Sequence, residues 1–344
     1  MIVLSLFDGM SGGQIALERV GIKVTKYFAA EIKKHAIKVT MNNYPNTIQI
    51  GDVTKIHYEN RVLYTEKGNY KMDKIDLLIG GSPCQDFSLL KANGKGLRGE
   101  KSKLFYEYLR ILKEVKPTYF LLENVRMKKE SEQQLNKYLG TDGIHINSNL
   151  VSYQNRPRIY WTNIPNVKAP IDKHIDFQDY IGKFGEDLEQ YKVKRTPSRE
   201  KMWNDGQGRK NQLKSCDNKT FAKKINCISR KQDRSPNSGL IQYKDFCRYL
   251  TRRELEQGQT VPLGYTDCVS YNQAQDLLGD GWTIDVITHI FNNLKHKATK
   301  GEILTRVLTA MDNLKELRWD IKENDLKEIE NILEKIKAET KKAS

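Results

Sequence analysis

The 344-residue chain has no run of about 18 apolar residues, the length that a membrane-spanning helix needs. Its first residues include a short apolar run, but no basic stretch precedes it and no cleavage site follows. Its five cysteines are odd in number and show no CxxC or Cys/His spacing, which argues against a disulfide framework and against a metal site. These absences predict a soluble, cytoplasmic protein without a metal or a membrane partner.

Positive charge is in excess in this chain. The chain has 58 Lys and Arg against 43 Asp and Glu, a formal net charge of +15, which suits a polyanionic partner. Residues 192–253 hold 18 Lys and Arg against five Asp and Glu, so the excess is concentrated in one span. Such a run is either a solvated face or a nucleic-acid-binding surface.

Short apolar runs alternate with helical patterns over the first 125 residues, as in a doubly wound parallel sheet. The runs lie at residues 2–7, 26–31, 47–53, 75–81 and 118–125. A helix is predicted at residues 13–20, and the β-rich stretch 143–165 predicts a hairpin at the sheet edge. The predicted fold class is therefore α/β, with a Rossmann-like sheet.

The last third of the chain has helical patterns at residues 250–259, 271–278 and 283–294. Apolar residues at helical spacing continue through residues 301–344, which predicts a helical tail. The apolar face of this tail is either a cap on the core or a partner site.

A glycine-rich segment, Phe7-Asp8-Gly9-Met10-Ser11-Gly12-Gly13, follows the first apolar run and begins a helix. Glu31 ends the second run about 20 residues later, where such folds place a carboxylate on ribose hydroxyls, and Asp52 follows the third. A structural turn and two solvated strand ends are the alternative. Both carboxylates beside a glycine loop favour a nucleoside cofactor.

Cys84 comes just after the fourth apolar run, in Gly80-Gly81-Ser82-Pro83-Cys84-Gln85. Most isolated cysteines are small buried apolar residues. Here glycines and a proline predict a tight turn at the carboxyl edge of the sheet, where open α/β folds bind ligands. The polar loop 85–103 is typical of a mobile lid. Glu123, in the next run, is expected at the same edge, which suggests a nucleophile and an acid.

Four segments, FDGMSGG, GGSPCQDFS, LLENV and QNRPR, together resemble the motifs of the carbon-5 cytosine-specific DNA methyltransferases of the prokaryotic or phage type. The resemblance implies a DNA (cytosine-5-)-methyltransferase that uses S-adenosyl-L-methionine. It assigns Cys84 to attack carbon 6 of cytosine, Glu123 to contact ring nitrogen 3, and Arg158 to support the base and Glu123, with Arg156 in the same motif. The implied cofactor-binding residues are Phe7, Asp8, Gly9, Gly12, Glu31, Ile32, Asp52, Val53, Pro83, Asp280 and Trp282.

The same resemblance implies double-stranded DNA as the partner. RYLTRRE, residues 248–254, resembles an element that supports the family's recognition domain. We therefore predict a catalytic domain from residues 1–165 and 248–298, a basic target-recognition domain at 166–247 and a helical extension at 299–344. The expected DNA-binding residues are Gln85, Ser88, Leu89, Arg98, Arg230, Lys231 and Arg234.

Residues 273–286 resemble the family's last motif, which completes the cofactor pocket, but depart from it in one place. The family commonly has Gly-Asn-Ser, whereas this chain has Gly279-Asp280-Gly281-Trp282. This departure leaves open whether Asp280 contacts the cofactor.

The chemistry explains the residue types. A thiolate that adds to carbon 6 turns carbon 5 of cytosine into a nucleophile, and positive charge from Arg158, Lys95 or Arg98 would favour the thiolate. A base stacked in a duplex cannot be reached, so the nucleotide must be flipped.

Two rival hypotheses remain at this point. The first is that the same chemistry acts on tRNA. The second is that the chain is a catalytically silent DNA-binding homologue, and the presence of Cys84, Glu123 and Arg158 argues against it. We expect a monomer in a bacterial or phage-infected cell, with a cognate restriction endonuclease as a further candidate partner.

Overall fold

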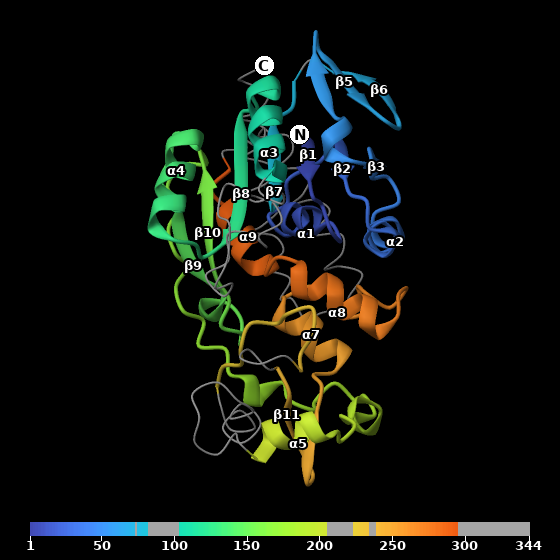
Figure 1. The fold of residues 1–344 in the computed structure, drawn as a ribbon. Coiled ribbons are helices and arrows are strands. Elements are labelled where there is room, and N and C mark those ends of the chain that lie inside the picture. Colours follow the sequence, from blue (N-terminus) through green and yellow to red (C-terminus); the bar gives the residue numbers. More distant parts are fainter. Residues whose placement is uncertain (73, 82–102, 205–222, 234–238, 295–344) are drawn as a thin grey trace, which may run out of the picture. The chain divides into compact units, whose positions relative to one another are not determined.

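The computed structural model describes residues 1–72, 74–81, 103–204, 223–233 and 239–294. Within these ranges the chain is organised around a seven-stranded sheet with the order β3-β2-β1-β7-β8-β10-β9 (Figure 1). The strands are β1 (Ile2–Leu6), β2 (Lys26–Ala30), β3 (Ile48–Gln49), β7 (Leu77–Gly81), β8 (Tyr119–Val125), β9 (Ile144–Asn147) and β10 (Pro157–Thr162). The first five run parallel, and β10 pairs antiparallel with β8 and β9. The expected doubly wound sheet and its antiparallel edge are confirmed.

The order of the strands reverses between β1 and β7. From β1 the chain proceeds outward through β2 and β3, and it then returns to place β7 and β8 on the other side of β1. In open α/β sheets the crevice at the carboxyl ends of such a reversal binds ligands. The fold therefore predicts a ligand-binding site at the loops after β1 and β7.

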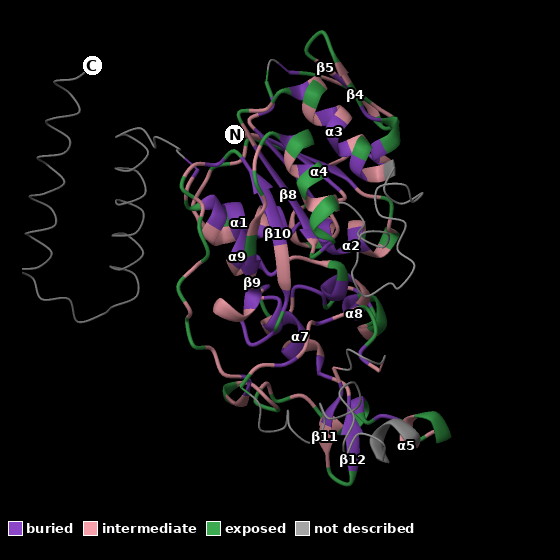
Figure 2. Cartoon of the chain, turned by 60° about the vertical axis from the view of Figure 1, so that its left-hand side comes forward, coloured by how far each residue is buried: buried purple, intermediate pink, exposed green. Residues whose placement is uncertain are grey.

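Both faces of the sheet are buried, which explains the continuous apolar runs in the sequence. Successive strand residues enter opposite cores: Leu77 and Ile79 pack in one, and Leu78 in the other. The first core also contains residues of α1 (Gly12–Arg19), α2 (Lys34–Asn43) and α9 (Ile284–Phe291), and the second those of α3 (Lys103–Val115) and α4 (Lys129–Leu139). Figure 2 shows the buried strands between these helices.

Segments near the two ends of the described part of the chain, residues 1–294, share one core. Ile15 and Ala16 of α1 belong to the same cluster as Ile284 and Ile287 of α9. Before α9 come α7 (Arg252–Gly258) and α8 (Tyr271–Asp280), which begin with capping boxes at Thr251 and Ser270. These three helices lie where the sequence predicted them, because cap residues and apolar spacing agree there. None of the helices in the described ranges is long and apolar enough to cross a membrane.

A small antiparallel sheet after the short helix η1 (Val53–Lys55) was not expected. It comprises β4 (His57–Glu59), β5 (Val62–Thr65) and β6 (Gly68–Lys71). Its strands have three or four residues each, and only β5 is mainly apolar, so no long apolar run marks them. Its first turn places Asn60 and Arg61 at φ 51° and 62°, and Arg is an unusual residue for this conformation.

Residues 166–247 contain little regular structure where they are described. Their elements are η5 (Phe177–Asp179), η6 (Leu188–Tyr191), α5 (Pro197–Asn204) and β11 (Ile241–Tyr243), which pairs with β12 (Phe246–Arg248). A small separate cluster forms around Val193, Leu240 and Phe246. Ile225 instead pairs with the backbone of Tyr153, which follows η4 (Ser148–Leu150). The proposed domain boundaries and the helical tail stay predictions, the tail lying outside the described residues.

Candidate functional site

A cavity of about 330 Å³ lies at the carboxyl ends of the parallel strands, at the reversal of strand order. Its lining includes every described residue that the sequence predicted for the cofactor and for catalysis. These are Phe7, Asp8, Gly9, Gly12, Glu31, Ile32, Asp52, Val53, Glu123, Arg156, Arg158, Asp280 and Trp282. Six segments far apart in the sequence thus meet around one cavity, although their binding roles stay predictions.

The glycine loop after β1 makes sharp turns, with Phe7, Gly9 and Ser11 all at φ between 56° and 60°. Glu31 holds this loop in place. Its Oε2 accepts a hydrogen bond of 2.8 Å from the Gly9 amide, and its Oε1 accepts bonds of 2.8 Å from the amides of Ile32 and Lys33. Glu31 therefore fixes the loop to the end of β2 and presents a carboxylate to the cavity.

Asp8 has a perturbed carboxyl group. Burial raises its pKa from 3.8 to about 6, although hydrogen bonds from Ser11 and from the Tyr27 hydroxyl (2.7 Å) oppose the shift. A carboxyl group whose pKa is raised by burial would be stabilised as a carboxylate by a cationic ligand. Asp8 is thus suited to an ammonium or sulfonium group.

The outer part of the cavity has an exposed apolar side chain and a capped turn. The Ile32 side chain is 69% exposed at its mouth. Asp52 accepts a hydrogen bond of 2.9 Å from the Thr54 amide and so caps η1, where Val53 is buried. An exposed apolar side chain together with an ordered carboxylate suits a nucleoside.

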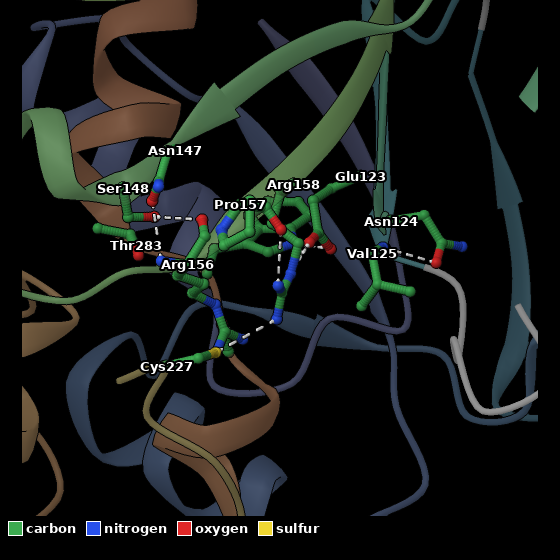
Figure 3. A network of polar contacts seen from close by, with 12 residues as sticks. Glu123, Asn124, Val125, Asn147, Ser148, Arg156, Pro157, Arg158, Cys227 and Thr283 are labelled. Carbon is green, nitrogen blue, oxygen red and sulfur yellow. Dashed lines mark hydrogen bonds and ion pairs between the residues drawn. The ribbon is translucent and has the colours of Figure 1, made fainter. Parts of the chain in front are cut away.

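At the inner end, Glu123 receives two donors. The Arg158 Nε atom lies 2.9 Å from Glu123 Oε1, and the Trp282 Nε1 atom donates to Oε2 at 3.1 Å. Glu123 is in β8 and Arg158 in the adjacent antiparallel strand β10, where Tyr160 is the register partner of Glu123. Figure 3 shows Arg158 between Glu123 and Cys227. The sheet register therefore brings together the acid and the arginine that the motifs predicted.

Arg156 has a different environment from Arg158. It is buried, and its guanidinium donates to the carbonyl oxygens of Ile228 (2.8 Å), Gly279 (3.0 Å) and Gly281 (2.7 Å). These bonds tie β10 to the end of α8 and to residues 227–228. Arg156 thus supports the wall of the cavity.

Sequence reasoning missed Cys227. Its Sγ atom lies 3.1 Å from Arg156 Nη1 and 3.9 Å from Arg158 Nη2. Burial acts to raise the pKa of the Cys227 thiol, but the two guanidinium groups outweigh it, so the pKa lies below the ordinary value. No sequence signal could reveal this, because about 70 residues separate Cys227 from both arginines.

Asp280 belongs to an ion-pair cluster at the mouth of the cavity. Its carboxylate lies 2.7 Å from Lys33 Nζ and 3.5 Å from Arg230 Nε. Asp276 also pairs with Lys33, Arg230 and His35. Arg230, expected to contact DNA, is thus engaged with two carboxylates, whereas Lys231 is exposed.

The remaining expected site residues lie outside the described ranges. They are Cys84, Pro83, Gln85, Ser88, Leu89, Lys95, Arg98 and Arg234. Among the described residues, no three His, Cys, Asp or Glu side chains form a group that could hold a metal ion.

Solved structures with the same fold include the Dnmt2 methyltransferase of S. pombe, with a TM-score of 0.61, 17% identity, and coverage of 86% of this chain and 100% of that one. Another is a putative DNA modification methyltransferase of an E. coli prophage, with a TM-score of 0.54, 19% identity, and coverage of 86% and 98%. At these identities the likeness shows the fold alone.

Sequence comparison identifies the family. The family model of the C-5 cytosine-specific DNA methylases matches residues 1–296, and the chain belongs to this family. The orphan methyltransferase M.Rho11sI of Bacillus phage rho11s is 36% identical over 126 residues, which are 36% of this chain and 23% of that protein. The type II methyltransferase M.NgoBV of Neisseria gonorrhoeae is 32% identical over 183 residues, 46% of this chain and 40% of that protein. The matches thus span less than half of these relatives.

Proposed function

We propose that this protein is a DNA (cytosine-5-)-methyltransferase that transfers a methyl group from S-adenosyl-L-methionine to a flipped cytosine in duplex DNA. One observation carries the proposal: Glu123, held by Arg158, lies in the same cavity as the glycine loop and the carboxylates of Asp8, Glu31 and Asp52. The same cavity thus holds an acid that could contact a nucleobase and a set of carboxylates that could bind a cationic nucleoside. Family membership supports this assignment.

The residues that line the cavity fit S-adenosyl-L-methionine. Its ribose hydroxyls would bind the carboxylate of Glu31, its adenine would lie against Ile32 and Val53, and its cationic methionine end would neutralise Asp8. A Cβ atom at Gly9 would meet no atom within 4 Å, so the backbone there has open space beside it. When bound, the cofactor would supply an electrophilic methyl group.

The protein's own groups would prepare the base. Cys84 adds as a thiolate to carbon 6, forming a carbon–sulfur bond, while Glu123 gives a proton to ring nitrogen 3. The electron pair then resides at carbon 5, which becomes methylated. Ring nitrogen 3 then returns its proton to Glu123, a base removes the proton from carbon 5, the carbon–sulfur bond breaks, and the Cys84 thiolate leaves.

A labelled methyl-transfer assay tests this function. We expect incorporation into unmethylated duplex DNA, none into tRNA, and a covalent adduct with DNA that contains 5-fluorocytosine. Cys84→Ser should abolish turnover and adduct formation while DNA binding persists. Transfer to tRNA alone would contradict the DNA assignment, and transfer without a trapped adduct would remove Cys84 as nucleophile.

DNA binding should weaken steeply with rising salt, because basic residues of the 192–253 span would displace counterions from phosphates. A flat salt profile would contradict this role for the span. Bisulfite sequencing of DNA from a methylation-free strain that expresses the chain would then report the target sequence.

The names of the relatives support two biological settings. M.NgoBV is a type II methyltransferase, and M.Rho11sI is an orphan methyltransferase from a phage. In the first setting the protein would protect host DNA from a cognate endonuclease, and in the second it would act without one. Digestion of the methylated DNA with candidate host endonucleases separates these settings.

A further inference from the structure

Trp282 directly follows Gly279-Asp280-Gly281, the place where the family commonly has Gly-Asn-Ser, and its indole contacts Glu123. Trp282 lies between α8 and α9, and its Nε1–H donates to Glu123 Oε2 at 3.1 Å. The other carboxyl oxygen, Oε1, is 2.9 Å from Arg158 Nε. Each oxygen of Glu123 thus has a fixed donor, and the two donors come from different motifs, QNRPR and the last one.

Gly81 at the end of β7 permits this contact. A Cβ atom at position 81 would lie 2.9 Å from Trp282 Nε1 and 3.0 Å from Glu123 Oε2, distances too short for an ordinary side-chain contact. The hydrogen bond between Trp282 and Glu123 therefore needs a residue without a side chain beside it.

The backbone around Trp282 is held on both sides. Arg156 Nη2 donates to the carbonyl oxygens of Gly279 and Gly281, at 3.0 and 2.7 Å. On the other side, the Thr283 hydroxyl donates to Gln259 Oε1 at 2.9 Å. Because these groups are largely buried, the turn that carries the indole has little freedom.

The same side chain reaches the glycine loop. A Cβ atom at Gly12 would lie 3.9 Å from Trp282 Cε3. One edge of the indole is thus next to the side of the cavity proposed for the cofactor. The indole N–H contacts Glu123 on the side proposed for the cytosine.

We propose that Trp282 is a positioning residue for Glu123: together with Arg158 it holds the carboxyl group in one orientation toward ring nitrogen 3 of the flipped cytosine. This inference rests on the proposed function. A carboxyl group with a fixed donor on each oxygen cannot rotate without breaking both bonds, so the proton that it gives to ring nitrogen 3 keeps a constant direction. Loss of the indole donor would leave Glu123 free to turn about Arg158.

The test removes the N–H group and keeps an aromatic ring. Trp282→Phe should lower kcat at saturating cofactor about ten- to a hundredfold, as expected for a misoriented catalytic group. The rate of adduct formation with 5-fluorocytosine DNA should fall equally, while the Kd of S-adenosyl-L-methionine should change less than about threefold. Trp161→Phe is the matched control, because its buried indole donates to Asn136 Oδ1 away from the cavity; it should leave kcat unchanged.

A second variant tests whether the loss in kcat comes from the missing N–H group and not from misfolding. Replacement of Trp282 by β-(3-benzothienyl)alanine exchanges N–H for sulfur at nearly constant shape, and it should reproduce the loss in kcat. The inference is overturned if kcat is unchanged in this variant, or if the whole defect is a weaker Kd that excess cofactor restores. If the wild-type protein transfers no methyl group to DNA or tRNA, the proposed function fails, and the inference fails with it.

Discussion

Lys33 and Asp280, which are 247 residues apart in the chain, form an ion pair of 2.7 Å at the mouth of the cavity. Lys33 follows β2, and Asp280 ends α8. Whether Asp280 contacts the cofactor stays a prediction, but the residue that departs from the family's last motif has two basic partners within the protein, Lys33 and Arg230. Its charge is therefore balanced before any ligand enters.

Asp280→Asn should change the free energy of unfolding by less than about 1 kcal/mol. The side chains of Lys33 and Asp280 are 35% and 48% exposed, and water and salt screen ion pairs of this kind. Urea denaturation at low and high salt measures the effect. A loss above about 3 kcal/mol would show that the cluster is structural.

Arg248→Met should be far more damaging. Arg248 and Glu254 form a buried, two-pronged ion pair with both distances 2.7 Å. Removing one partner leaves a buried charge uncompensated, which costs about 3–5 kcal/mol. The same denaturation assay applies, and Arg248→Met combined with Glu254→Gln should recover part of the loss. Equal losses in the single and double variants would contradict the explanation.

Asp8→Asn should stabilise the empty protein at neutral pH. The pKa of Asp8 is raised from 3.8 to about 6, so the folded state binds its proton more tightly than the unfolded state. Stability is therefore lost as pH rises from about 4 to 6, by at most about 3 kcal/mol, and stays lost above that range. The Asn variant should gain this amount at pH 8 and nothing near pH 4.

The same variant should bind S-adenosyl-L-methionine more weakly, because it lacks the carboxylate for the cationic end. Denaturation at pH 4 and pH 8 and calorimetric titration measure the two effects. A variant that is no more stable than wild type at pH 8 would contradict the proposed cost of ionising Asp8.

Substitution of the two motif arginines by lysine should separate their roles. Arg156→Lys loses the planar fork that bonds three backbone carbonyls, so we expect a loss of stability of about 2–4 kcal/mol. Arg158→Lys loses the Nε donor to Glu123. We expect at least a tenfold lower kcat with a nearly unchanged cofactor Kd. Thermal unfolding and steady-state kinetics distinguish these outcomes, and identical effects of the two variants would refute the division.

Local patterns were sufficient for the elements with strong apolar periodicity or caps. The five parallel strands and the helices α7, α8 and α9 appear where the sequence predicted them. The small sheet β4–β6 was missed because its strands are only three or four residues long and are stabilised by pairing with one another, which a local pattern does not record. The resemblance to the family also implied that Arg158 supports Glu123, and the structure brings these two side chains together.

The local sequence was enough to predict the chemical groups of the site: a glycine loop, carboxylates at strand ends, a cysteine after a tight turn, and a basic span. These features could be predicted because strand ends and turns depend on neighbouring residues. Which of the groups meet depends on the tertiary structure. The register of β10 on β8 joins Arg158 to Glu123, and the packing of the last helices against the first places Trp282 on the same acid. Such contacts arise from the packing of distant segments, and spacing along the chain carries no information about them.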